Sequence, residues 1–367
     1  MSLLQEWKLR GPVRTIRAEL SEWDLSKEQW QAPCRVTVTQ FRRDGCISEM
    51  EDYRPNGPIS RWKYSYDDVG RLLESAFQQN DGPIATTVHR YDKLGRLVQK
   101  IFRDGSGTER ESEIYTYDDG GRKTKLEFVS RPENAAACGT TGCGTASVYG
   151  VEGAELAYGA EGVVTITTRY DDNERSCEAL FHDENRSLIV RVILTRDAAG
   201  RLIKEESLCG DHPPFSLPQA LEKAPPEERA AEAAAFAQLF SPQQVMWSTT
   251  YRYDDRGRRI ERCGSLCAMS RKRAVWEYDE NDNPVRMFEE NSVGDLKADE
   301  SGNLELVNPK SFRREGRYEY KYDPHGNWTE RIVLARYETN SDFQRANIER
   351  KEIDYYTSNC PRDLETL

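Results

Sequence analysis

Short stretches in which apolar and polar side chains alternate recur along this chain, and they predict β-strands. Within residues 59–66, Trp62, Tyr64 and Tyr66 point to one side, and Arg61, Lys63 and Ser65 point to the other. Residues 312–322 and 327–337 show the same period of two. We expect an aromatic ladder on one face of a sheet, and its exposed members are candidate binding residues. These candidates are Trp62, Tyr64, Tyr318, Tyr320 and Trp328.

The predicted strands are separated by a repeated turn sequence in which Tyr-Asp is followed, three residues after the Asp, by Gly. Tyr66-Asp67-Asp68-Val69-Gly70-Arg71-Leu72 is a full copy, and the next copy begins 25 residues later at Tyr91. The Asp side chain can accept backbone hydrogen bonds within the turn, and Gly can adopt a positive φ without steric cost. This combination is typical of a type I turn with a bulge that joins two antiparallel strands. The turn residues predicted in this way are Asp67 and Gly70, Asp92 and Gly95, Asp118 and Gly121, Asp254 and Gly257, and Asp323 and Gly326.

The spacing predicts an all-β fold, a long antiparallel β-meander of about twenty strands in a curved or spiralling sheet. One short inserted helix is expected near residues 226–240, where an Ala-rich stretch follows two prolines. The predicted segments are an N-terminal cap (1–40), YD repeats (41–130), a Gly/Ala/Thr-rich insertion loop (131–157), YD repeats (158–207), a Pro-rich and helical insertion (208–247), YD repeats (248–337) and a C-terminal cap (338–367).

In series, these Tyr-Asp-x-x-Gly-Arg-Leu units resemble the Rhs/YD repeat of bacterial polymorphic toxins, insecticidal toxin-complex subunits and teneurins. The resemblance covers roughly residues 35–337. In the large members it implies a ribbon of β-strands that spirals into a hollow shell around a polypeptide. This chain is far shorter, so it is more similar to the small stand-alone YD-repeat proteins of bacteria.

Charge and hydropathy narrow the classes of protein to be considered. Asp and Glu number 63 against 52 Lys and Arg, which gives a net charge of −11 and argues against a nucleic-acid binder. No apolar run reaches the length of a membrane-spanning helix, and the first residues contain no apolar signal core. We therefore expect a cytoplasmic protein with no membrane contact, although export by another route stays open.

Nine cysteines without an export signal indicate free thiols. Cys138 and Cys143 form one close pair and Cys263 and Cys267 another, and together they are weak candidates for a zinc site. Neither spacing is the usual two-residue knuckle, so ordinary thiols are the favoured interpretation. No cofactor is expected.

The sequence contains no phosphate-binding loop, no zinc-protease motif and no nucleophile elbow, so an enzyme is not favoured. The first functional hypothesis is a non-catalytic scaffold whose wide concave sheet binds, holds or masks a partner polypeptide, with a toxin or effector as one candidate. The second is a carbohydrate-binding protein that uses the aromatic ladder. The third is a hydrolase inside a closed β shell. Exposure of the aromatic residues separates the first two hypotheses.

Overall fold

The computed structural model describes residues 9–55, 57–130, 165–171, 175–211, 241–266, 270–298, 304–337 and 342–356. Within these residues every regular element is a β-strand. The predicted insertion loop (131–157) and the predicted helix near 226–240 both lie entirely outside the described residues.

Twenty-one strands follow one another along the chain, and almost every strand pairs with its sequence neighbour in antiparallel fashion. The strands are β1 (Val13–Asp24), β2 (Gln29–Trp30), β3 (Arg35–Phe41), β4 (Ile47–Tyr53), β5 (Ile59–Tyr66), β6 (Leu72–Gln79), β7 (Ala85–Tyr91), β8 (Leu97–Arg103), β9 (Glu109–Tyr117), β10 (Lys123–Ser130), β11 (Thr165–Tyr170), β12 (Ser176–His182), β13 (Leu188–Arg196), β14 (Leu202–Cys209), β15 (Val245–Tyr253), β16 (Arg259–Leu266), β17 (Ser270–Tyr278), β18 (Pro284–Ala298), β19 (Leu304–Tyr322), β20 (Trp328–Tyr337) and β21 (Gln344–Tyr355). The prediction of an all-β antiparallel meander of about twenty strands is confirmed.

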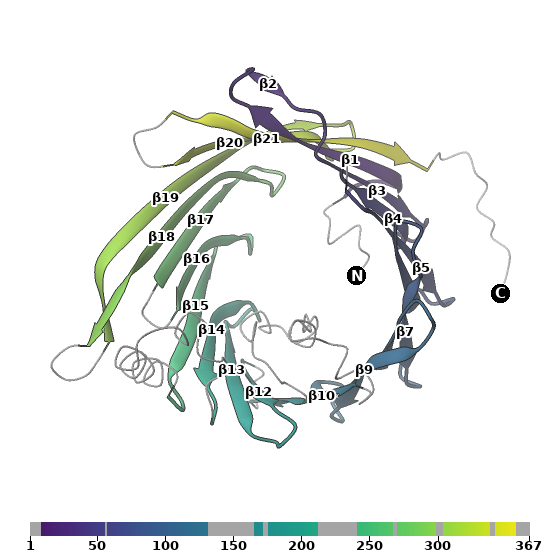
Figure 1. The fold of residues 1–367 in the computed structure, drawn as a ribbon, viewed down its shortest axis with the longest axis vertical. Helices are drawn as coiled ribbons and strands as arrows, with labels where there is room; N and C mark the ends of the chain where they lie inside the picture. Colours follow the sequence, from purple (N-terminus) through teal and green to yellow (C-terminus); the bar gives the residue numbers. More distant parts are fainter. Residues whose placement is uncertain are drawn as a thin grey trace, which may run out of the picture.

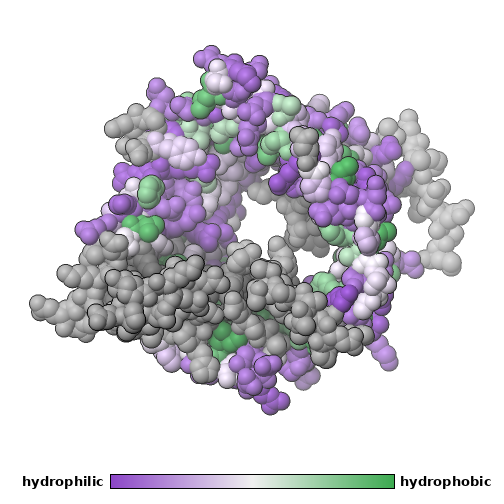
Figure 2. All heavy atoms as spheres, in the orientation of Figure 1, coloured by the Kyte–Doolittle hydropathy of each residue, from purple (hydrophilic) through white to green (hydrophobic). Residues whose placement is uncertain are grey.

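The sheet closes into a barrel, which the sequence did not predict. β1 pairs with β3 on one side and with the last strand, β21, on the other, from Val13 opposite Tyr355 to Glu22 opposite Asn347. β2 pairs only with the end of β1, so 20 strands form the closed wall. Figure 1 shows these strands in a ring, and Figure 2 shows the molecule hollowed along the ring's axis. The expected curved or spiralling sheet is not confirmed, because β1 and β21, the first and last long strands, pair with each other and close the sheet.

The two faces of this wall differ in chemistry. The tyrosine of each turn and the residues at every second position along its strands share one face of the wall, which we call the inner face. Leu9 packs against this inner face beside Ile16 and Tyr64. A larger buried cluster lines the inner face of β9 to β15, where Phe181, Val190 and others are fully buried.

The outer face carries ion pairs between neighbouring strands. Arg61 bonds Glu51 and Lys63 lies 3.3 Å from Glu49 across the β4–β5 ladder. Alternating a charged outer face with an aromatic inner face explains how a chain with 31% charged residues forms an ordered sheet.

Candidate functional site

The repeated turns assemble at one rim of the barrel into a structure that we call the turn ladder. In each full repeat the Asp Oδ1 accepts the backbone N–H groups of the second and fourth residues after it. Its Oδ2 accepts a hydrogen bond from the Arg that follows Gly, at 2.6 Å for Asp67–Arg71 and 2.7 Å for Asp92–Arg96. These bonds hold the pKa of Asp67 below its usual range, with the backbone N–H of Arg71 as the largest stabilising contact.

The same arginine links each turn to the next one. Arg71 stacks over the ring of Tyr91 at 5.1 Å, and Arg96 stacks over Tyr117 at 4.9 Å. The hydroxyl of Tyr91 then donates to the carbonyl oxygen of Leu72 at 2.9 Å. Asp, Arg and Tyr of the repeat are therefore structural residues, and they fix the spacing of the hairpins.

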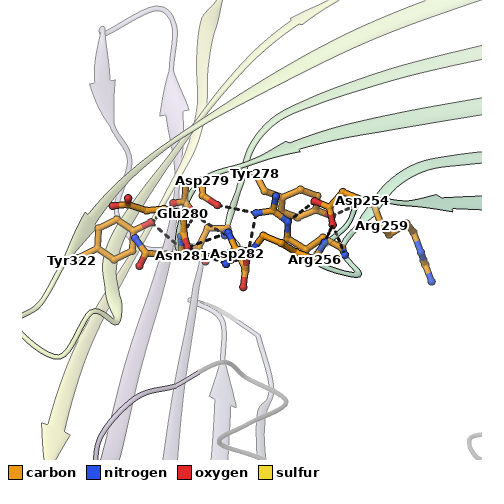
Figure 3. Close-up of polar contacts among 11 residues, drawn as sticks. Asp254, Arg256, Arg259, Tyr278, Asp279, Glu280, Asn281, Asp282 and Tyr322 are labelled. Atoms are coloured by element: carbon orange, nitrogen blue, oxygen red, sulfur yellow. Dashed lines mark hydrogen bonds and ion pairs between the residues drawn. The ribbon is translucent and has the colours of Figure 1, made fainter. Parts of the chain in front are cut away.

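Figure 3 shows the two turns of the turn ladder that begin at Asp254 and Asp279, between which the repeat sequence changes. Arg258 donates to Asp254 at 2.7 Å and to the carbonyl oxygen of Asp279 at 2.9 Å. In the following turn Asn283 occupies the position of the arginine, and Tyr322 donates directly to Asp279 Oδ2 at 2.6 Å. Replacing the large arginine by asparagine leaves space beside this part of the rim.

A cavity of approximately 490 Å³, which we call the rim cavity, occupies this region. The chain before β1, the two asparagine-containing turns and the end of β21 line it. Its lining residues are Leu9, Arg10, Asn281, Asp282, Asn283, Pro284, Gly326, Asn327, Trp328 and Lys351.

Asn327 positions Arg10 at the wall of the rim cavity. Its side-chain oxygen accepts the Arg10 N–H at 2.7 Å, and its side-chain nitrogen donates to the Arg10 carbonyl oxygen at 2.8 Å. The same nitrogen also donates to the Tyr355 hydroxyl at 2.6 Å. Gly326 gives the guanidinium room, since an added Cβ would lie 2.8 Å from Arg10 Nη1.

Lys351 is the second cation of the rim cavity. It lies on β21 opposite Ala18, and its Nζ sits 3.2 Å from the centre of the Trp328 ring. Burial lowers its pKa to about 8, and the positive charge of Arg331 acts in the same direction. Glu349 opposes the shift, but its carboxylate is bonded to Arg331 at 2.7 Å.

The charge balance of the rim cavity favours an anion. Among the described residues that line it, the only carboxylate is Asp282, which already pairs with Arg256 at 2.9 Å and with Arg258 at 3.1 Å. Within the described residues, no carboxylate lies within ion-pair distance of the Arg10 or Lys351 side chains. Leu9, Pro284 and Trp328 add apolar surface beside these two cations.

The structure separates the residues that the sequence singled out into two groups. The predicted turn residues all lie in turns at one rim, and every predicted turn glycine has a positive φ, as at Gly70 (82°) and Gly326 (81°). The predicted aromatic residues are half-buried along the lumen side of the wall rather than on an open sheet. Of these aromatic residues, only Trp328 lines the rim cavity.

The predicted metal candidates are not brought together in the described part of the chain. Cys138, Cys143 and Cys267 lie outside the described residues, and Cys263 is a free thiol on β16. Where residues are described, no group of three His, Cys, Asp or Glu is arranged to hold a metal ion.

Sequence reasoning missed Arg10 and Lys351 because neither belongs to a repeat unit. The signal that could have pointed to this region was the loss of the repeat arginine at Asn283 and Asn327, since earlier copies of the repeat carry arginine there, as at Arg96 and Arg258. The contribution of Lys351 depends on closure of the barrel, which brings the end of the chain beside its beginning.

Comparison with known proteins yields distant structural matches alone. No family model matches the chain, and no curated protein matches it. A porin-like protein from Bacteroides uniformis superposes with a TM-score of 0.27 and 11% identity, covering 94% of this chain and 98% of that chain. Pseudomonas aeruginosa OpdK, solved with vanillate, gives a TM-score of 0.27 and 9% identity, with coverages of 92% and 97%. At these scores the matches assign neither a ligand nor a function to this chain.

The functions expected from the sequence are corrected. The polypeptide-binding scaffold relied on a wide concave sheet surface and the carbohydrate-binding ladder on an open sheet, whereas the wall is a closed barrel. The third hypothesis was a hydrolase inside a closed β shell. None of the three hypotheses is carried forward.

The expected cytoplasmic location without membrane contact is also corrected, because the sheet closes into a barrel, an architecture for which the length of apolar runs does not test membrane contact. That expectation rested on the lack of long apolar runs, whereas membrane barrels use short alternating strands that contain none. In the described part of the chain, no helix has the length and hydrophobicity required to cross a bilayer.

Proposed function

We propose that this protein binds a small organic anion in the rim cavity. The observation that carries the proposal is the pair of cations, Arg10 and Lys351, which face one cavity whose single carboxylate is already ion-paired. A volume of approximately 490 Å³ lies in the range of small-molecule sites.

The lining suggests how such a ligand is held. The planar guanidinium of Arg10 can donate two parallel hydrogen bonds to a carboxylate, and the bonds from Asn327 hold the Arg10 backbone in place. Lys351 contributes a second positive charge, and Trp328 with Leu9 and Pro284 offers surface to an apolar body. The ligand class is therefore an anion with a compact apolar part.

Calorimetric titration with a charge-matched series tests this function. Benzoate, benzyl alcohol and benzylamine have similar size and differ in charge, so we expect benzoate to bind the most tightly. Arg10→Gln should weaken benzoate binding about tenfold, the size expected for loss of a charge-assisted hydrogen bond.

Lys63→Met is the matched control, since Lys63 is an exposed lysine on the outer face. It should leave the benzoate affinity unchanged. Equal affinity for the three probes, or equal loss of binding in the Arg10 and Lys63 variants, would refute the proposal.

We also propose that the chain is related to Rhs/YD-repeat proteins. The support is the series of Tyr-Asp-x-x-Gly turns together with the Arg–Tyr stacking that joins consecutive copies, as at Arg71 and Tyr91. A profile built from these turns alone should retrieve YD-repeat proteins. Retrieval of unrelated β-proteins at equal rank would contradict the kinship.

A further inference from the structure

Lys351 differs in its surroundings from most lysines of the described barrel wall. Many wall lysines have a carboxylate partner, as Lys100 has in Glu113 at 3.1 Å and Lys321 in Glu330 at 2.7 Å. Lys351 instead lies flat against the Trp328 ring, with Ala18 as its cross-strand neighbour. Its amine lines a cavity and meets no carboxylate at ion-pair distance within the described residues.

Apart from the Trp328 ring, these surroundings destabilise the charged form of Lys351, so its amine loses a proton more easily than that of an exposed lysine. Arg331 brings a second positive charge to the same tryptophan ring, at 5.2 Å from its centre. Glu349, the nearest opposing charge, is engaged by Arg331. Desolvation and a neighbouring cation are the two conditions that make a lysine nucleophilic near neutral pH.

We propose that Lys351 forms a reversible imine with an aldehyde or ketone group of a ligand in the rim cavity. This inference rests on the proposed function and specifies its ligand as an anion that also carries a carbonyl group. The lone pair of Nζ attacks the carbonyl carbon to give a carbinolamine. The carbinolamine oxygen then leaves as water after taking up protons, one from the nitrogen and one from solvent, and a C=N bond remains.

The rim cavity can hold both the anionic group and the carbonyl group of such a ligand. Arg10 and Lys351 line the same cavity from the chain before β1 and from β21. An anionic group at the Arg10 guanidinium would therefore place the remainder of the ligand near the lysine. Holding the reacting groups in one cavity raises the rate of a step that is slow in dilute solution.

The test uses 4-formylbenzoate with sodium cyanoborohydride, which reduces an imine to a stable secondary amine. Intact mass measurement should show one adduct per chain at limiting reagent, and peptide mapping should place it on Lys351. The rate of adduct formation should increase with pH and level off above about 8, the pKa of Lys351. Exposed lysines such as Lys63 should react at least tenfold more slowly at pH 8.

Two variants separate reaction from folding and from anion binding. Lys351→Arg retains a cation that cannot form an imine, so the adduct should disappear while the circular dichroism spectrum is unchanged. Arg10→Gln should slow adduct formation about tenfold at low reagent concentration and leave the adduct on Lys351.

The outcomes distinguish the two proposals. Adducts spread evenly over exposed lysines, or benzoate binding without any adduct on Lys351, would overturn the imine and leave anion binding intact. A Lys351 adduct that forms equally well with uncharged benzaldehyde, together with no benzoate binding, would support the imine and refute anion binding.

Discussion

At the scale of single residues, departures from the repeat place polar groups on the lumen wall. The position after the repeat arginine is leucine in several copies, such as Leu72 and Leu97, but it is Lys123 and Arg259 in two others. Lys123 lies 4.4 Å from the centre of the Tyr115 ring, and Arg259 lies 4.3 Å from that of Tyr251. The two tyrosines donate to the buried carboxylates of Glu113 and Glu205, respectively. One substitution in a repeat therefore changes an apolar wall position into part of a polar cluster.

The lowered pKa of Lys351 predicts a specific pH dependence of stability. The unfolded chain binds a proton at this lysine up to about pH 10.5, whereas the folded chain releases it near pH 8. The free energy of unfolding should therefore rise between pH 8 and pH 10.5, because the unfolded state holds more protons in that range. Lys351→Met should remove a rise on the order of 2 kcal/mol, given about 1.4 kcal/mol for each pKa unit and partial exposure. Urea unfolding of both proteins at pH 7.5 and pH 10.5 measures the difference, and parallel pH profiles would contradict it.

Removing the Glu315 carboxylate from the outer face should destabilise the protein. Its side chain is only 6% exposed and accepts hydrogen bonds from Arg286 and Arg336. Glu315→Gln should lower the free energy of unfolding by about 2 kcal/mol, since two guanidinium groups lose a charged acceptor. The exposed pair of Arg313 and Glu290 is the control, and Glu290→Gln should cost about 0.5 kcal/mol or less. Equal effects of the two variants in urea unfolding would show that burial of the Glu315 ion pairs is unimportant.

At the scale of elements, the hairpin is the unit that the sequence encodes most directly. The turns predicted from Asp and Gly occur where expected, and β5 spans the stretch 59–66 that alternation predicted. The sequence encodes these features because a positive φ and a period of two are local properties of the chain. The role of the turn arginine was not predicted, because its partner Tyr lies in the next copy of the repeat.

Gly257 lies in the turn before β16 and Gly264 lies within that strand, and we expect the two positions to differ in their tolerance of a side chain. Gly257 has a φ of +78°, so Gly257→Ala should cost about 1 kcal/mol even though a Cβ would meet no atom within 4 Å. Gly264 has no positive φ, and its Cβ would make ordinary contacts beginning at 3.5 Å from Thr249. Gly264→Ala should therefore be close to neutral. Thermal unfolding of the two variants measures this difference. A larger decrease of the melting temperature in Gly264→Ala than in Gly257→Ala would contradict the turn assignment.

At the scale of the whole molecule, closure joins the two ends of the chain. Tyr356 donates to the carbonyl oxygen of Phe41 and its N–H bonds Pro12, so the end of the chain continues the turn ladder. The described outer positions of this barrel carry ion pairs between neighbouring strands, such as Arg273–Glu261 at 2.6 Å.

A disulfide across the closing seam tests the barrel directly. Glu19 and Arg350 are direct partners in the β1–β21 ladder. Paired strands bring Cα atoms to about 4.5–5.5 Å, which suits a disulfide. The double variant E19C/R350C should therefore form an intramolecular cross-link, detected as a linked peptide under non-reducing conditions.

The matched control for this cross-link is E19C/E330C. Glu330 pairs with Arg350 from the other side, so it lies two strands, or about 10 Å, from Glu19. This pair should not cross-link. Failure of the first pair, or equal yields from both, would indicate that the sheet is open at this seam.

The sequence alone determined where the β-strands and the hairpin turns lie and how far apart the repeats are. It could do so because the alternation of side chains and the Asp-x-x-Gly turn each depend on a few neighbouring residues. Only the tertiary structure decided that the meander closes, which face becomes the lumen, and that Arg10, Trp328 and Lys351 share one cavity. Those outcomes depend on contacts between residues more than 300 positions apart, such as Arg10 with Asn327. A repeat that is nearly the same in every copy specifies how each hairpin folds, but the number of hairpins and their cumulative twist decide whether the ring closes.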